Sequence, residues 1–78
     1  MTGTPGTAGE RVAAVVDAVR ETCGGREPAA GEPVLPPGAD SMTALALALA
    51  LEDRLGVAVP PSLLREGHDP AALAGRLA

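Results

Sequence analysis

The run of alanine and leucine from Met42 to Leu55 constrains the fold of this chain more than any other feature. Its leucines alternate with alanines, which is the period of a β-strand. Alanine and leucine, however, are among the best helix formers, and no β-branched residue occurs between Ala44 and Leu55. Gly56 closes the run at the place where a helix C-cap glycine is expected. We therefore predict an α-helix with Asp40 as its N-cap and Ser41 at its first position.

This helix is expected to have two apolar faces, because residues two apart lie on different sides of a helix that turns about 100° per residue. One face carries Leu47, Leu51 and Leu55, flanked by Ala44 and Ala48. The roughly opposite face carries Met42, Leu45 and Leu49. A small domain buries one face of a helix thoroughly, so the second face is a candidate partner surface. The alternative is that Leu45 and Leu49 also cover the core.

The other predicted helices are separated by proline and glycine. From Glu10 to about Cys23, apolar residues recur at three- and four-residue steps, which predicts an amphipathic helix that begins near Gly9. Residues 62–65 fit a short helical turn, and Asp69 is a natural N-cap for a last helix with Pro70 at its first position. We therefore expect an all-α fold, a small four-helix bundle with two long helices, one short helix and one of medium length.

A long Pro/Gly-rich loop is predicted between the first two helices. Four prolines and four glycines between residues 24 and 40 exclude regular structure there. We expect the apolar pair Val34 and Leu35 to pin this loop over the core. By composition the chain divides into a flexible N-terminal leader, residues 1–8, and one domain, residues 9–78.

Composition limits the partners that this chain can have. It has 78 residues and no Phe, Tyr or Trp, so its core must come from leucine, valine, methionine and alanine. Six arginines and no lysine against ten acids give a net charge of −4, which makes nucleic acid a poor partner. The one cysteine, Cys23, cannot form an intramolecular disulfide, and the sequence shows neither a signal peptide nor a membrane span. We expect a cytoplasmic monomer.

Catalytic and metal-binding sets are hard to assemble from these residues. His68 is the one histidine and lies in a predicted loop, so a triad of Ser41, His68 and an aspartate would need a cleft that the composition does not support. The simpler interpretation of His68 is an exposed loop residue. One cysteine and one histidine do not make a zinc site, and the glycines do not follow the order of a nucleotide-binding loop. We expect no enzyme activity and no metal.

Ser41 is the strongest functional lead, because the N-terminus of a helix favours an anion such as a phosphodiester on a first-turn side chain. The stretch Gly38-Ala39-Asp40-Ser41-Met42 resembles the G-x-D-S-[LM] signature of acyl and peptidyl carrier proteins. Residues 55–60, Leu-Gly-Val-Ala-Val-Pro, are similar to a second pattern of that family, L-G-[hydrophobic]-x-[hydrophobic]-P. The resemblance spans residues from about 10 to 78.

The resemblance implies that a dedicated transferase attaches 4′-phosphopantetheine to Ser41. The thiol of this arm then carries acyl or aminoacyl groups as thioesters. The resemblance also assigns Asp40, Met42, Leu45 and Leu49 to the surface that partner enzymes bind. These partners are the phosphopantetheinyl transferase, a loading enzyme, and downstream synthases, synthetases or tailoring enzymes. A carrier needs only a rigid support and a docking surface, so the lack of a catalytic set agrees with this interpretation.

Departures from the family pattern narrow the subtype. Fatty-acid carriers have several acids along the helix after the serine, whereas this chain has alanines in the middle of that helix. Ala39 and Arg65 stand where many modular carriers have aromatic residues. Residues 69–74 resemble polyketide and peptide-synthetase carriers, so we expect a discrete carrier in specialised metabolism, such as antibiotic biosynthesis. Two alternatives remain open. One is an unmodified interaction module that binds through the second apolar face, and the other is a small hydrolase that uses Ser41 and His68.

Overall fold

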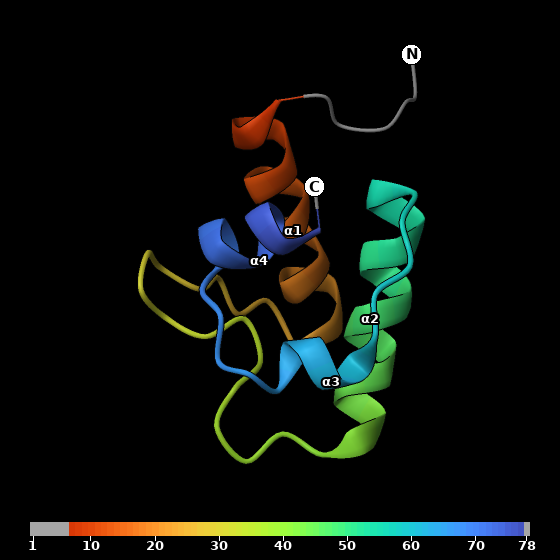
Figure 1. The fold of residues 1–78 in the computed structure, drawn as a ribbon. Helices are drawn as coiled ribbons and strands as arrows, with labels where there is room; N and C mark the ends of the chain where they lie inside the picture. Colours follow the sequence, from red (N-terminus) through yellow and green to blue (C-terminus); the bar gives the residue numbers. More distant parts are fainter. Residues whose placement is uncertain (1–6, 78) are drawn as a thin grey trace.

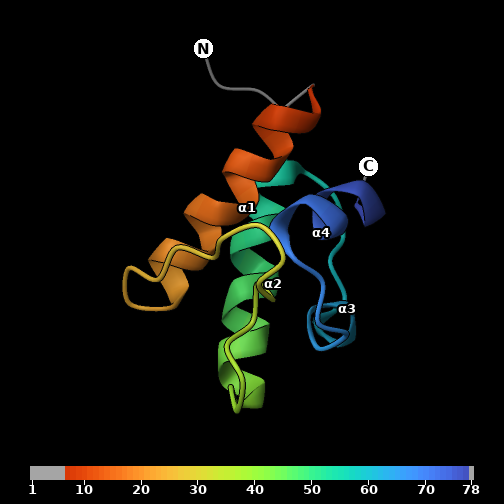
Figure 2. The ribbon, with the colours of Figure 1, turned by 90° about the vertical axis from the view of Figure 1, so that its left-hand side faces the viewer.

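A computed structural model describes residues 7–77 of the chain, and the regular secondary structure of these residues is entirely α-helical. The helices follow in the order α1 (Ala8–Thr22), α2 (Ser41–Leu55), α3 (Pro61–Leu64) and α4 (Pro70–Arg76) (Figure 1). No strand occurs within the described range, so the helical interpretation of the alanine–leucine run is confirmed. The long helices α1 and α2 pack against each other, α4 packs against α1, and α3 packs against α2 (Figure 2).

A capping box at Thr7 starts α1 slightly earlier than the predicted position near Gly9. Thr7 Oγ1 accepts a hydrogen bond from the Glu10 amide at 3.1 Å, and Glu10 Oε1 accepts one from the Thr7 amide at 3.3 Å. These reciprocal bonds satisfy two backbone donors that a helix start would otherwise leave unpaired. Thr7 and Ala8 therefore belong to the start of the helix. The rest of the predicted leader, residues 1–6, lies outside the described residues.

The inner face of α2 forms the centre of the core, as predicted. Leu47, Leu51 and Leu55 are each at most 2% exposed. The flanking alanines of the same face, Ala44 and Ala48, are equally buried. The other elements contribute the remaining buried apolar side chains Val15, Ala18, Val19, Val34, Leu35, Val59, Leu64, Leu73 and Ala74. Small aliphatic side chains thus build the whole core, because the chain has no aromatic residue to fill it.

The loop between α1 and α2 is held against the core by the two apolar residues that the sequence singled out. Val34 is fully buried and Leu35 is 9% exposed, so the expectation that they pin the loop is confirmed. The Arg26 guanidinium donates to the carbonyl oxygens of Val34 at 2.9 Å and Pro33 at 2.8 Å. The Val34 amide in turn donates to the carbonyl oxygen of His68 at 2.9 Å. These bonds fix the path of the loop toward α2.

Asp69 joins this loop to α4. One oxygen of its carboxylate, Oδ1, accepts a hydrogen bond from the Ala72 amide at 2.8 Å and so caps α4, as predicted. The other oxygen, Oδ2, accepts one from the Gly31 amide at 2.9 Å. Backbone hydrogen bonds to the carboxylate favour its charged form, so they lower the pKa of Asp69.

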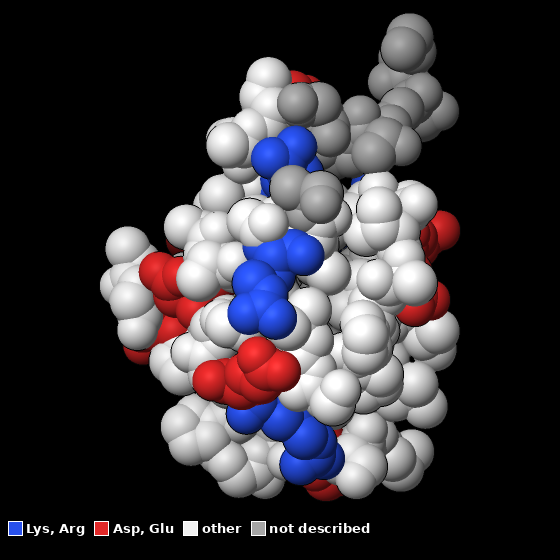
Figure 3. All heavy atoms as spheres, in the orientation of Figure 1, with Lys and Arg blue, Asp and Glu red and all other residues white. Residues whose placement is uncertain are grey.

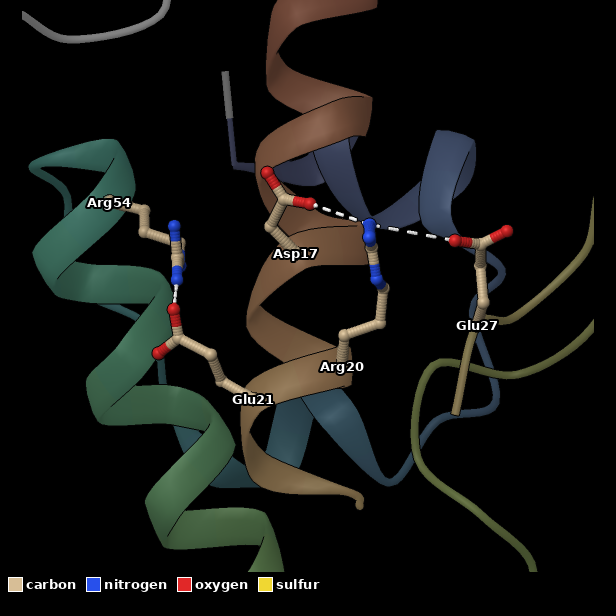
Figure 4. Close-up of polar contacts among 5 residues, drawn as sticks. All are labelled: Asp17, Arg20, Glu21, Glu27 and Arg54. Carbon is tan, nitrogen blue, oxygen red and sulfur yellow. Dashed lines mark hydrogen bonds and ion pairs between the residues drawn. The ribbon is translucent and has the colours of Figure 1, made fainter. Parts of the chain in front are cut away.

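Ion pairs link α1 with its neighbours on the surface (Figure 4). Arg54 of α2 pairs with Glu21 of α1. Arg20 of α1 pairs with Asp17, one turn before it, at 3.2 Å and reaches Glu27 in the loop at 3.6 Å. Exposed pairs of this kind contribute about 0–1 kcal/mol each, so the fold depends mainly on its apolar core.

Candidate functional site

Ser41 is the first residue of α2, and its side chain is exposed. The preceding residue, Asp40, is the N-cap, with Oδ1 accepting from the Thr43 amide at 2.9 Å and from the Thr43 hydroxyl at 2.8 Å. Because Asp40 caps the helix, the Ser41 hydroxyl is not needed for that purpose. The predicted arrangement of N-cap and first helical residue is confirmed.

Arg65 reaches Ser41 from a distant part of the sequence. It is the C-cap of α3, and its Nη2 donates to Ser41 Oγ at 3.2 Å. This contact brings the end of α3 to the start of α2, although the residues are 24 positions apart. Sequence reasoning missed the contact, because it treated Arg65 only as a departure from an aromatic position. No periodicity in the sequence links the two residues.

The charged side chains near Ser41 are Asp40, which precedes it, and Arg65, which contacts it. The amide of Thr43, followed by its hydroxyl and by the positive charge of Arg65, stabilises the Asp40 carboxylate and lowers its pKa. The Asp40 Oδ1 that faces the helix is already engaged with Thr43. In the described part of the chain, no carboxylate or imidazole forms a hydrogen bond with the Ser41 hydroxyl that would draw off its proton.

His68 does not pair with Ser41. Its Nε2 lies 3.0 Å from Glu66 Oε1, and no hydrogen bond joins His68 to Ser41 among residues 7–77. Its side chain is only 20% exposed, so the interpretation of His68 as an exposed residue is wrong, although it does lie in a loop. Its carbonyl oxygen accepts a hydrogen bond from the Val34 amide, which joins this part of the chain to the loop between α1 and α2. The arrangement needed for a Ser41–His68 hydrolase is therefore not formed.

The cap at Asp40 predicts a specific loss of stability in acid. Folding lowers the pKa of Asp40 below its ordinary value of 3.8. The charged cap therefore stabilises the fold fully above that value, and this contribution is lost as the pH falls through the folded-state pKa. Wild-type protein should lose more free energy of unfolding between pH 6 and pH 3 than Asp40→Asn, since asparagine caps a helix without titrating. Urea unfolding followed by circular dichroism at both pH values measures the difference.

Asp53, on the same helix, provides the matched control for this experiment. Its carboxylate caps no helix. Asp53→Asn should show the same acid loss as the wild type. An equal loss in wild type and Asp40→Asn would contradict the role assigned to the Asp40 carboxylate.

The second apolar face of α2 is open to solvent. Met42 is 79% exposed, Leu45 50% and Leu49 57%. The expectation of an exposed second face is confirmed, and the alternative that Leu45 and Leu49 cover the core is wrong. The surface over α2 is largely uncharged, with acidic side chains at its margin (Figure 3).

An open hollow of about 350 Å³ lies between the end of the loop and α3. It is lined by Pro33, Leu35, Pro36, Pro37, Gly38, Ala39, Leu64, Arg65 and Gly67. Arg65 thus borders the hollow as well as contacting Ser41. Within residues 7–77, no cluster of three or more His, Cys, Asp or Glu side chains could hold a metal ion. No helix in that range has the length and apolar content to span a membrane.

Comparison with known families gives a match over most of the chain. The model of a family described as phosphopantetheine attachment site matches residues 13–77, a stretch that includes most of α1 and all of α2, α3 and α4. Both Ser41 and Ser62 lie within it. The comparisons with curated proteins and with solved structures gave no match.

Proposed function

Since this chain belongs to the phosphopantetheine attachment site family, whose members bind 4′-phosphopantetheine covalently on a serine, we propose that Ser41 is the serine that receives it. The chain has two serines, Ser41 and Ser62, and both are exposed. Ser41 begins a helix of 15 residues, whereas Ser62 lies in a helix of four. A longer helix offers a stronger dipole and a complete first turn of amides to an attached anion. The observation that carries the proposal is therefore the exposed Ser41 hydroxyl at the start of α2.

The surroundings of Ser41 suit a phosphodiester. The hydroxyl is accessible, the N-terminal end of α2 is positive, and the Arg65 guanidinium contacts the reacting oxygen. Ser41 Oγ forms a new bond to the phosphorus next to the pantetheine of coenzyme A, and its proton passes to a base outside this chain. The bond from that phosphorus to 3′,5′-ADP breaks, and 3′,5′-ADP leaves with the electron pair. When bound, the group supplies a thiol that holds acyl or aminoacyl cargo as a thioester.

Residues 9–78 act, in this proposal, as a carrier domain in polyketide or nonribosomal-peptide biosynthesis, working as a cytoplasmic monomer without catalytic activity of its own. Support for the pathway comes from the sequence of α2, whose middle has alanines where fatty-acid carriers have acids. The resemblance of residues 69–74 to polyketide and peptide-synthetase carriers points the same way. Cargo is chosen by partner enzymes rather than by side chains of this chain.

Met42, Leu45 and Leu49, with Asp40 beside them, form the proposed docking surface for those enzymes. In protein interfaces, a minority of residues near the centre, fewer than about 30% of the total, cost more than about 1 kcal/mol of binding free energy when truncated to alanine. The double variant Leu45→Ala/Leu49→Ala should lower kcat/KM of the phosphopantetheinyl transferase about tenfold, which corresponds to about 1.4 kcal/mol. Steady-state kinetics of coenzyme A transfer measure this effect.

Val57 supplies the control for the docking surface, because it is 37% exposed and lies beyond the end of α2. Val57→Ala should leave kcat/KM near the wild-type value. Unchanged kinetics in Leu45→Ala/Leu49→Ala, with an unchanged free energy of unfolding, would show that the transferase docks elsewhere.

The proposal is tested by incubating the protein with coenzyme A and a broad-specificity transferase and then measuring its intact mass. We expect one phosphopantetheinyl group per chain. The main alternative is an unmodified helical module that binds a partner through the exposed face of α2. That module predicts no added mass and a partner function that survives Ser41→Ala.

A further inference from the structure

We propose that Arg65 forms an ion pair with the phosphodiester on Ser41 and so holds the first atoms of the attached arm at the junction of α2 and α3. This inference rests on the proposed function, since it requires the arm to be on Ser41. It gives Arg65 a positioning role that the family match does not assign.

The inference starts from the contact between Arg65 and Ser41. The Nη2 atom of Arg65 lies 3.2 Å from the same Ser41 oxygen that would bear the phosphorus. A hydrogen bond of that length to a neutral hydroxyl is at the long end of the usual range. Bonds from a guanidinium to a phosphate oxygen are shorter and stronger, because both groups are charged. Attachment of the arm would therefore replace a weak partner of Arg65 with a strong one at the same place.

The guanidinium has donors to spare for this purpose. It presents five N–H groups in a planar fork that matches phosphate oxygens, and its bond to Ser41 uses one of its two terminal nitrogens. Within residues 7–77, Arg65 forms no ion pair at 4.0 Å or less, whereas Arg20 and Arg54 are paired with acids. The charge of Arg65 also acts on Asp40, whose Oδ1 is engaged by Thr43.

Space is also available beside the guanidinium. Arg65 is exposed and borders the open hollow, which Pro37, Ala39 and Leu64 also line. A phosphate on Ser41 can thus be reached by Arg65 without moving a core side chain. Since α3 packs against α2, the backbone that carries Arg65 is fixed relative to Ser41 (Figure 1).

The experiment uses ³¹P NMR of the loaded protein, whose attached arm supplies its phosphorus. Wild type, Arg65→Gln, Arg65→Lys and Arg76→Gln are loaded from coenzyme A, and loading is checked by intact mass. Arg76 is the matched control, because it is an exposed arginine near the end of α4. We expect the ³¹P resonance to shift in Arg65→Gln, to return toward the wild-type value in Arg65→Lys, and to stay unchanged in Arg76→Gln. Salt at about 1 M, where the Debye length is about 3 Å, should move the wild-type resonance toward that of Arg65→Gln.

A second readout follows the arginine itself. The side-chain Nε–H resonance of Arg65 should shift when the wild type is loaded, while that of Arg76 should not. Identical ³¹P resonances in wild type and Arg65→Gln, with no shift of the Arg65 signal on loading, would overturn the inference. A slower transferase reaction in Arg65→Gln with unchanged ³¹P spectra would also overturn it, since Arg65 would then contact the transferase. If the wild type gains no mass at all, the proposed function itself has failed, and this inference fails with it.

Discussion

Replacing Ser41 with alanine is expected to abolish loading with phosphopantetheine, because the variant lacks the hydroxyl oxygen that we assign as the nucleophile. The chain has one other serine, Ser62, which is exposed in the four-residue helix α3. Intact mass spectrometry after incubation with coenzyme A and a transferase should show one added group on the wild type and none on Ser41→Ala.

Ser62→Ala is the matched control for this result. It removes the second serine without touching α2, so it should load as completely as the wild type. Added mass on Ser41→Ala that disappears in the double variant Ser41→Ala/Ser62→Ala would move the attachment site to Ser62. The two serines lie on different helices, and each is removed by its own variant, so the experiment shows which of them carries the added mass.

Replacing Leu51 with alanine is expected to lower the free energy of unfolding by about 2–5 kcal/mol. Leu51 is fully buried on the inner face of α2, and its truncation leaves a cavity among aliphatic neighbours. Small domains have only about 5–15 kcal/mol of total stability, so this loss removes a large fraction of it. Urea unfolding followed by circular dichroism measures the loss.

Leu49→Ala tests whether the loss comes from burial rather than from the alanine itself. Leu49 lies two residues away on the same helix but is 57% exposed, so the same substitution should change the free energy of unfolding by about 0.5 kcal/mol or less. Equal losses at both positions would mean that the two faces of α2 have been assigned incorrectly.

Local signals in the sequence predicted the features that depend on neighbouring residues. Asp69 followed by Pro70 marked the start of α4, and Gly56 marked the end of α2. In the structure Gly56 adopts the left-handed conformation, with φ of 70°. The two faces of α2 followed from helical geometry alone. The apolar pair Val34 and Leu35 predicted where the loop is anchored on the core. The capping box of Thr7 and Glu10 was also readable, since Thr-x-x-Glu is a known start signal, but the composition of the first eight residues concealed it.

Contacts between distant parts of the chain were not predictable in this way. Arg65 reaches Ser41 only because α3 packs against α2, and the two carbonyl oxygens that Arg26 binds are brought to it by the path of the loop. Backbone carbonyls look the same at every position of a sequence, so no pattern of side chains marks them as acceptors. The hydrogen bond from the Val34 amide to the carbonyl oxygen of His68 is a further contact of this kind.

The placement of Ser41, Leu45 and Leu49 at four-residue steps along α2 has a geometric consequence for any enzyme that docks there. A helix rises about 1.5 Å per residue, so Leu49 lies roughly 12 Å along the axis from Ser41, the proposed attachment residue. An enzyme that contacts both residues must therefore place its two contact points at about that distance from each other. Inserting or deleting a single residue between Ser41 and the leucines would rotate Leu45 and Leu49 by about 100° around the helix axis relative to Ser41. The spacing along α2 therefore fixes both the distance and the direction between these residues.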